Sequence, residues 1–200
     1  MTEENIDDRL WRGETLETRA AGRRRQLLDA GYRLMGDGGS AAVTMRAVVR
    51  EAELSPRYFY ESFADTDELI VAVYDHCNAQ LAEALAGALL GGAEDLDGLI
   101  RAAVTEASSF FLAESARVQI LVREPLSNTM LGSRRIGGAQ ELLGPLMLLL
   151  EAEAPGAGAV DEGRLKLAVS SLSGSFTFLI LDWLDGRLEA SQEQLVEHAT

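Results

Sequence analysis

Residues 44–60 of this chain of 200 residues read TMRAVVREAELSPRYFY, and they decide the fold of its N-terminal part. Apolar residues recur with the spacing i, i+3, i+4 and i+7 from Met45 to Ala52, which predicts one face of a short helix, with Thr44 as its N-cap. Ser55 followed by Pro56 predicts the start of a second helix, because proline at the first helical position lacks only an N–H that would be unpaired there. A turn of about two or three residues joins the two.

Two short helices joined by a tight turn, with apolar anchors such as Val48 and Phe59, are typical of a helix-turn-helix motif. In that motif the second helix enters the DNA major groove by its N-terminal residues, while the first crosses the backbone. Arg57 can donate two hydrogen bonds to O6 and N7 of a guanine. Tyr58 and Tyr60 offer hydroxyl groups to phosphates and ring faces to thymine methyl groups. The stretch therefore predicts a DNA-reading helix.

Helical periodicity continues on both sides of this stretch, and strand signals are nearly absent. A first helix of about 15 residues is predicted to end at Gly36-Asp37-Gly38-Gly39, and a capping box of Asp65 and Glu68 opens a helix of more than about 20 residues. Gly91-Gly92 ends that helix. Ser191 and Gln194 form a second capping box. Further helices are predicted at 96–112, 116–123, 128–152, 162–183 and 192–198, with Pro125 breaking the chain before the third.

Residues 23–73 resemble the TetR family of one-component regulators. The resemblance rests on the arginine-rich segment RRRQLLDA (23–30), on TMRAVV (44–49), on LSPRYFYESF (54–63) and on DTDEL (65–69). WLDGRL (183–188) and residues 191–198 are similar to the closing dimer helices of the family, and Trp11-Arg12-Gly13 resembles an N-terminal extension of some members. The implied fold is all-α: a flexible arm (1–18), a three-helix helix-turn-helix domain (19–66) and, joined by a long helix, an effector-binding and dimerisation domain (67–200).

The resemblance also implies a set of contacts with double-stranded DNA. Thr44 and Tyr60 match residues that touch phosphates, and residues 55–58 match the base-reading stretch. Pro56, Arg57 and Tyr58 depart from the usual residues of the family, so the operator sequence cannot be transferred from relatives. The predicted DNA-binding residues are Arg23, Arg24, Arg25, Thr44, Met45, Arg46, Ser55, Pro56, Arg57, Tyr58 and Tyr60.

The charge of the chain supports this interpretation only when it is counted locally. The whole chain carries −14, which by itself disfavours a nucleic-acid partner. Residues 18–60 nevertheless hold eight arginines and four acidic residues, a net charge of +4, while residues 61–200 carry −14. Affinity for DNA depends on the phosphates that the docked face neutralises, so a basic N-terminal part suffices.

The C-terminal part is predicted to hold an apolar pocket for an unknown small-molecule effector and a homodimer interface. Small residues that recur along 162–183 allow another helix to approach closely, and two such helices from each subunit would form a four-helix interface. The candidate pocket residues are Phe110, Phe111, Leu112, Ile120, Leu121, Met130, Leu146, Met147, Phe176 and Phe178, with Arg123, Glu124 and Asn128 as polar gates. The candidate interface residues are Ser170, Gly174, Thr177, Leu181, Trp183, Leu184, Leu195 and Val196.

Several classes of function receive no support from the sequence. The single cysteine, Cys77, and two histidines predict no metal site and no disulfide framework, and we expect neither a cofactor nor an enzymatic activity. The acidic N-terminus does not resemble a secretory signal, and uninterrupted apolar runs are too short to span a membrane, so we expect a cytoplasmic protein. The predicted function is a ligand-responsive repressor that binds a palindromic operator as a dimer. The alternatives are an activator and, favoured by Thr66 in place of a common lysine, a helical dimer that binds a ligand or protein without DNA.

Overall fold

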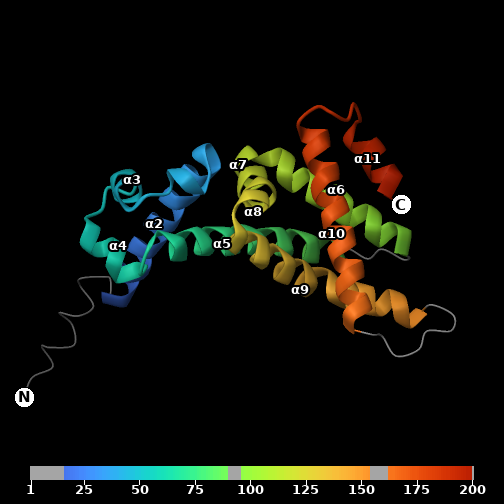
Figure 1. The fold of residues 1–200 in the computed structure, drawn as a ribbon, viewed down its shortest axis with the longest axis horizontal. Helices are drawn as coiled ribbons and strands as arrows, with labels where there is room; N and C mark the ends of the chain where they lie inside the picture. Colours follow the sequence, from blue (N-terminus) through green and yellow to red (C-terminus); the bar gives the residue numbers. More distant parts are fainter. Residues whose placement is uncertain (1–15, 90–95, 154–161, 200) are drawn as a thin grey trace, which may run out of the picture. The chain divides into compact units, whose positions relative to one another are not determined.

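The computed structural model describes residues 16–89, 96–153 and 162–199 (Figure 1). Every regular element in these ranges is helical, which confirms the all-α prediction. By their contacts the residues form two compact units, Met1–Val73 and Tyr74–Thr200. The elements of the first unit are α2 (Leu16–Gly38), the 3-10 turn η1 (Ser40–Ala42), α3 (Met45–Glu51), α4 (Pro56–Ser62) and the start of α5 (Thr66–Leu89). The predicted N-terminal arm lies mostly outside the described residues, as does Gly91-Gly92.

Helix α2 begins earlier than the sequence predicts, since it starts at Leu16 and spans 23 residues. Glu17 lies in its first turn, where a carboxylate interacts favourably with the helix dipole. The arginines at 23–25 consequently lie inside the helix rather than at its N-terminus. Their charges therefore do not oppose the dipole at the start of the helix.

The first unit packs around aromatic and aliphatic side chains from all of its helices. Phe59 and Leu27 are fully buried, and so is Val48 of α3. Helices α2 and α5 approach closely at Gly31, where an added Cβ would lie 3.0 Å from Cγ2 of Val73 and 3.3 Å from Leu69. These contacts tie the first two turns of α5 to the first unit, so the two units meet within this helix after Val73. The predicted domain boundary after residue 66 remains a prediction.

The ends of these helices follow the local rules read from the sequence. Oγ1 of Thr44 accepts a hydrogen bond from the backbone N–H of Ala47 at 3.2 Å, which confirms the predicted N-cap of α3. Gly39, at φ 71°, follows the end of α2 and donates its N–H to the carbonyl oxygen of Met35. The capping box at the start of α5 differs from the prediction in one partner. The N–H of Glu68 donates to the side chain of Asp65 as expected, but the carboxylate of Glu68 accepts from the N–H of Ala64 instead of that of Asp65.

The turn between α3 and α4 contains a strained residue. Glu53 has φ 54°, and it is the one non-glycine residue in the described ranges with a positive φ. The turn is held by the N–H of Leu54, which donates to the carbonyl oxygen of Val49 at 2.9 Å. A side chain with a Cβ in the left-handed region is costly, so the packing of the two helices enforces this conformation.

The second unit contains the rest of α5 and seven further elements. These are α6 (Leu96–Ala113), α7 (Ser115–Val118), the π-helical turn η2 (Gln119–Arg123), α8 (Glu124–Ser127), α9 (Thr129–Glu153), α10 (Glu162–Leu184) and α11 (Gln192–Ala199). Helix α9 packs on α8 and α10, and α11 packs on α6. The capping box of α11 is confirmed, because Ser191 and Gln194 each donate a backbone N–H to the other's side-chain oxygen.

Pro125 does not break the chain as the sequence predicts. The chain runs helically from α7 through η2 into α8, and the break comes at Asn128, whose backbone is extended (φ −103°, ψ 110°). A proline inside an α-helix clashes with the carbonyl group four residues earlier. The wide π turn immediately before α8 relieves that constraint at Leu121, so the chain continues past the proline.

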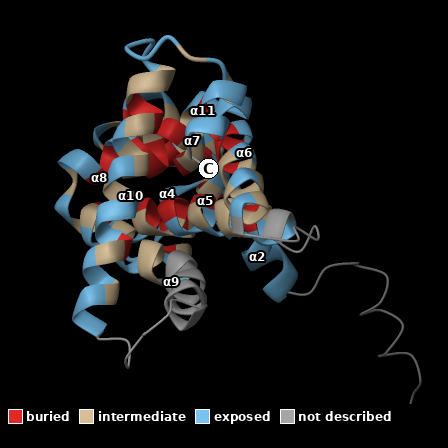
Figure 2. Ribbon diagram, turned by 90° about the vertical axis from the view of Figure 1, so that its right-hand side faces the viewer, coloured by how far each residue is buried: buried red, intermediate tan, exposed pale blue. Residues whose placement is uncertain are grey.

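Helix α10 is more apolar than its uninterrupted runs indicate. Its most apolar window has a mean hydropathy of 1.5, and only 17% of that window is buried within the chain. The expectation that no segment is long and apolar enough to span a membrane is therefore wrong by the measures of length and composition. Figure 2 shows that much of α10 is coloured as exposed or intermediate, which leaves an apolar helix face without a partner in the described residues.

Replacing Glu53 with glycine is expected to stabilise the protein by about 1 kcal/mol, because glycine adopts the left-handed conformation without the steric cost of a Cβ. The midpoint of urea unfolding of the full-length chain measures this change. Glu53→Ala is the matched control, since it removes the carboxylate but keeps the Cβ. An equal gain in both variants would contradict the explanation, because it would assign the cost to the charge of Glu53.

Candidate nucleic-acid interface

Helix α4 presents two different faces because its aromatic residues are spaced four apart. Phe59 and Phe63, at the end of the helix, are buried, with exposed fractions of 0% and 1%. Pro56, Arg57 and Tyr60 are nevertheless exposed, and Tyr60 is 60% exposed. Most of the residues of α4 that the sequence predicts to meet DNA are therefore open to solvent, with Ser55 as the N-cap at its start.

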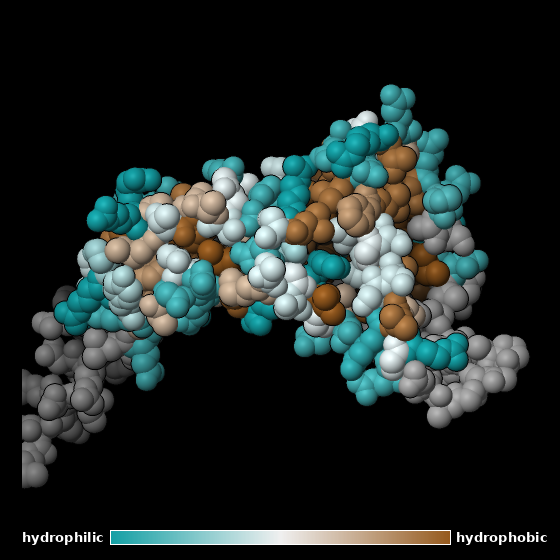
Figure 3. Space-filling view, in the orientation of Figure 1, coloured by the Kyte–Doolittle hydropathy of each residue, from teal (hydrophilic) through white to brown (hydrophobic). Residues whose placement is uncertain are grey.

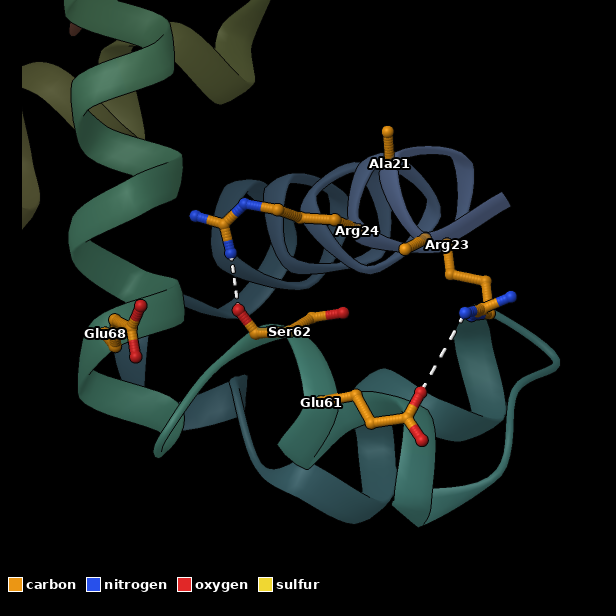
Figure 4. Close-up of a pocket in the computed structure, with 7 residues that line it drawn as sticks. Ala21, Arg23, Arg24, Glu61, Ser62 and Glu68 are labelled. Carbon is orange, nitrogen blue, oxygen red and sulfur yellow. Dashed lines mark hydrogen bonds and ion pairs between the residues drawn. The ribbon is translucent and has the colours of Figure 1, made fainter. Parts of the chain in front are cut away.

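Two of the predicted DNA-binding arginines of α2 contact α4. The guanidinium of Arg23 lies 4.4 Å from the centre of the Tyr58 ring, and that of Arg24 lies 4.1 Å from the centre of the Phe63 ring. Nη1 of Arg24 also donates to the backbone carbonyl oxygen of Ser62 at 2.6 Å (Figure 4). Both arginines thus fix α4 against α2, while Arg25 remains exposed.

Arg57 is the exposed cation of the α4 face. Its side chain is 84% exposed, and its Nε donates to Oε1 of Glu61 at 2.8 Å, one helical turn away. The hydrogen bond and the charge of Glu61 raise the pKa of the Arg57 guanidinium further above its ordinary value, so the group is cationic at every relevant pH. A permanently charged, planar donor on an exposed helix face is suited to phosphates and to guanine.

Helix α3 contributes a second group of predicted contacts. Arg46 is exposed and Met45 is half-buried beside it. The side-chain oxygen of Thr44 accepts the capping hydrogen bond, so its hydroxyl hydrogen remains available to donate to a phosphate. The α3 and α4 faces together can therefore offer charged and hydroxyl donors to a nucleic-acid backbone.

Sequence reasoning missed Glu61, which accepts from Arg57 and lies 3.9 Å from Nη2 of Arg23 through its other oxygen. The spacing of Arg57 and Glu61 by four residues is the signal that could have found it, because residues four apart are neighbours on a helix. The proximity of Arg23 carries no such local signal, since it depends on how α2 packs against α4.

The comparisons with known proteins agree with this geometry. The family model described as bacterial regulatory proteins of the tetR family matches residues 27–73. The chain is 28% identical over 194 residues to the HTH-type transcriptional regulator BetI of Rhizobium meliloti (strain 1021), covering 84% of this chain and 91% of the relative. These matches support a TetR-family regulator. The chain is a DNA-binding transcriptional regulator and not an enzyme.

Solved structures share the TetR-family fold over most of the chain. A TetR-like transcriptional regulator from Rhodococcus sp. RHA1 has a TM-score of 0.65 and 22% identity, and covers 88% of this chain and 91% of its own. The transcriptional regulator FadR from Bacillus subtilis in complex with stearoyl-CoA has a TM-score of 0.69 and 13% identity, with 88% and 94% covered. At these identities the likeness establishes the arrangement of helices, not the ligand.

Four of the ten predicted apolar pocket residues belong to the buried core of the chain. Phe110, Phe111, Ile120 and Leu121 are buried, and the two phenylalanine rings meet edge to face at 5.6 Å. Phe176 is half-buried. Leu112 and Phe178 are exposed and Met130 is half-buried, while the side chains of Leu146 and Met147 lie outside the described residues. The pocket remains a prediction.

The three predicted gate residues have structural partners in this conformation. Oδ1 of Asn128 accepts from the N–H groups of Met130 and Leu131, and it thereby caps α9. Buried Glu124 accepts a hydrogen bond from Gln119 within the same turn at 2.9 Å. Arg123 forms an ion pair with Asp185 that connects η2 to the end of α10. In this conformation the printed contacts of all three residues serve the packing of the chain itself.

The predicted interface residues divide between two environments. Leu181, Leu195 and Val196 are buried inside the chain, and α11 packs on α6. Ser170 is exposed, Gly174 has no atom within 4 Å of the position of an added Cβ, and Thr177, Trp183 and Leu184 are half-buried. The large apolar residues exposed on α10 are Leu167, Leu172 and Phe178, of which sequence reasoning assigned none to the interface.

Cys77 is buried on α5 in the second unit, which agrees with its interpretation as a small apolar residue rather than a redox sensor. Burial raises the pKa of its thiol to about 12, and burial likewise raises the pKa of nearby Tyr74 to about 12. The reactive thiolate is therefore almost absent in the folded protein at neutral pH.

We expect Cys77 to resist a disulfide-exchange reagent in the folded protein near neutral pH and to react fully once the chain is unfolded by guanidinium chloride. The pKa of the thiol is 9.0 in the unfolded chain and about 12 in the folded protein. The contribution of Cys77 to the free energy of unfolding is therefore fully present below pH 9.0 and is lost as the pH rises toward 12. Because the chain contains one cysteine, the thiolate released from the reagent reports the reaction of Cys77 alone. Rapid reaction of the folded protein at neutral pH would contradict this account.

Proposed function

We propose that this regulator is a homodimeric repressor of a palindromic operator, released by a small-molecule effector. The observation that carries the proposal is the exposure of Pro56, Arg57 and Tyr60 on α4, while Phe59 and Phe63 are buried. A helix of seven residues reads few base pairs. Two copies related by a two-fold axis would read two half-sites in major grooves at least one helical turn apart.

The apolar face of α10 supports the homodimer. Leu167 and Phe178 lie on one face of this helix and are 70% and 59% exposed, and Gly174 on the same face leaves open space. Apolar side chains gather over this helix in Figure 3. A soluble protein rarely leaves such a face uncovered, and an isologous contact between two copies would bury it without requiring a membrane. This accounts for the hydropathy of α10 and is consistent with an operator-binding protein in the cytoplasm.

The effector is the least specified part of the proposal. The Bacillus subtilis neighbour of the same fold was solved in complex with stearoyl-CoA, so helical domains of this arrangement can hold a small molecule with an apolar chain. In this chain the buried Phe110, Phe111, Ile120 and Leu121 are the candidate lining. To release an operator almost completely, an effector must favour the non-binding conformation by about 10⁴-fold.

The decisive experiment is selection of bound sequences from random double-stranded DNA by the full-length protein, followed by titration of the selected operator over a range of salt concentrations. A palindromic consensus whose binding weakens with salt is the expected result. A reporter under that operator then separates repression from activation. Failure to enrich any sequence would overturn operator binding by this chain.

Arg57→Ala is expected to weaken binding to the selected operator by about 10- to 100-fold and to relax the preference for guanine at one position of each half-site, because a bidentate contact to O6 and N7 is lost. Arg46→Ala is the matched comparison. It should weaken binding to all sequences alike. It should also reduce the slope of log affinity against log salt concentration by about one, the value expected for the loss of one phosphate contact. Fluorescence anisotropy with operator and scrambled duplexes measures both. Equal effects of the two variants on base preference would contradict these roles.

Phe178→Glu is expected to convert the dimer to a monomer, because it places a charge on the exposed apolar face of α10. Sedimentation equilibrium measures the mass. Leu126→Glu is the matched control, since Leu126 on α8 is also a large exposed apolar residue, 49% exposed, but lies outside α10. A Phe178→Glu protein that stays dimeric while Leu126→Glu dissociates would place the interface elsewhere.

A further inference from the structure

An acidic side chain lies on the face of α4 that is proposed to meet DNA. The carboxylate of Glu61 accepts a hydrogen bond from Nε of Arg57 at 2.8 Å through Oε1, and its Oε2 lies 3.9 Å from Nη2 of Arg23. Figure 4 shows Glu61 and Arg23 facing one another across the hollow between α2 and α4. A carboxylate at a DNA-binding surface repels phosphates, so its presence there calls for a physical role.

The orientation of the Arg57 guanidinium indicates that role. Glu61 engages Nε, which leaves the terminal nitrogens Nη1 and Nη2 to donate elsewhere. These two nitrogens form one edge of the planar fork, and two parallel donors are what the O6 and N7 acceptors of guanine require. The side chain is 84% exposed, so the contact with Glu61 is the main restraint on its rotamers within the described residues.

Glu61 is itself held in place from the other side. Arg23 faces its second oxygen, and the guanidinium of Arg23 is fixed 4.4 Å from the centre of the Tyr58 ring. The cluster of Arg23, Tyr58, Glu61 and Arg57 therefore extends from α2 to the exposed edge of α4. It connects the packing of the two helices to the direction of the arginine side chain.

We propose that Glu61 is a specificity-determining positioning residue, which holds Arg57 in the orientation that reads guanine and prevents it from binding phosphates indiscriminately. This inference rests on the proposed function, since it assumes that α4 reads an operator. An unrestrained arginine on this face would turn toward the nearest phosphate, a contact that contributes affinity for every sequence equally. The Glu61 carboxylate repels the phosphate and so disfavours that contact. Its hydrogen bond to Nε orients Arg57 for the bidentate contact with guanine.

The test compares the selected operator with the same duplex carrying 7-deazaguanine, which lacks the N7 acceptor, at the position whose guanine preference depends on Arg57. Dissociation constants for both duplexes are measured with the full-length protein and with Glu61→Ala and Glu61→Gln. Glu51→Gln is the matched control, because Glu51 pairs with Arg33 at 2.8 Å and its loss changes the net charge equally. Circular dichroism establishes that each variant is folded.

For the unchanged protein and for Glu51→Gln, we expect the 7-deazaguanine duplex to bind at least about fivefold more weakly than the operator. For Glu61→Ala the ratio should fall below about twofold, with binding to scrambled DNA unchanged or tighter, and Glu61→Gln should lie between because its amide oxygen still accepts from Nε. A merely structural ion pair would alter thermal stability but leave this ratio intact.

Two outcomes would overturn the inference. If Glu61→Ala binds both duplexes more tightly with an unchanged ratio, Glu61 acts only as a general repulsive charge. If the unchanged protein binds the two duplexes equally, Arg57 does not read that guanine and needs no positioning. Both outcomes are compatible with a selected operator, and so they differ from failure of the proposed function, in which no sequence is selected.

Discussion

The burial of Phe59 and Phe63 on one side of α4 is the constraint on which the N-terminal unit depends. Their four-residue spacing fixes which side of this short helix turns inward, and Arg57 on the far side must then face solvent. The same burial places the Phe63 ring where Arg24 can stack on it. Apolar packing therefore determines which groups are available to DNA, and it also determines where Arg24 and Arg57 lie.

Features that depend on residues near in sequence were predictable. Thr44 caps α3, Gly39 follows the end of α2 with a positive φ, and Ser191 and Gln194 cap α11, because each device requires only two or three neighbouring residues. The exposed position of Arg57 also follows from local periodicity. The helix-turn-helix could accordingly be located from the sequence before any contact between helices was known.

Features that depend on packing were not predictable in the same way. Pro125 is tolerated because a π turn precedes it, and the sequence rule for proline assumes a regular helix. Leu195 and Val196 have the spacing of an interface but are buried inside the chain. Arg23 has the charge of a phosphate ligand yet stacks on Tyr58. In each case the outcome depends on the structure that surrounds the residue. The residue type could be interpreted from the sequence, but the element that packs against it could not be predicted.

The Arg57–Glu61 pair illustrates why a weak contact in the free protein can matter in a complex. Exposed ion pairs are screened by water and salt and add little to stability. When α4 enters a groove, water is displaced, and the same charges then interact through a lower effective dielectric. In solution the orientation of the Arg57 guanidinium has little effect on stability. In the groove the same orientation decides which acceptor the guanidinium meets. In the proposed homodimer each copy would offer one such arginine, so discrimination of about tenfold per half-site would multiply to about a hundredfold for the whole operator.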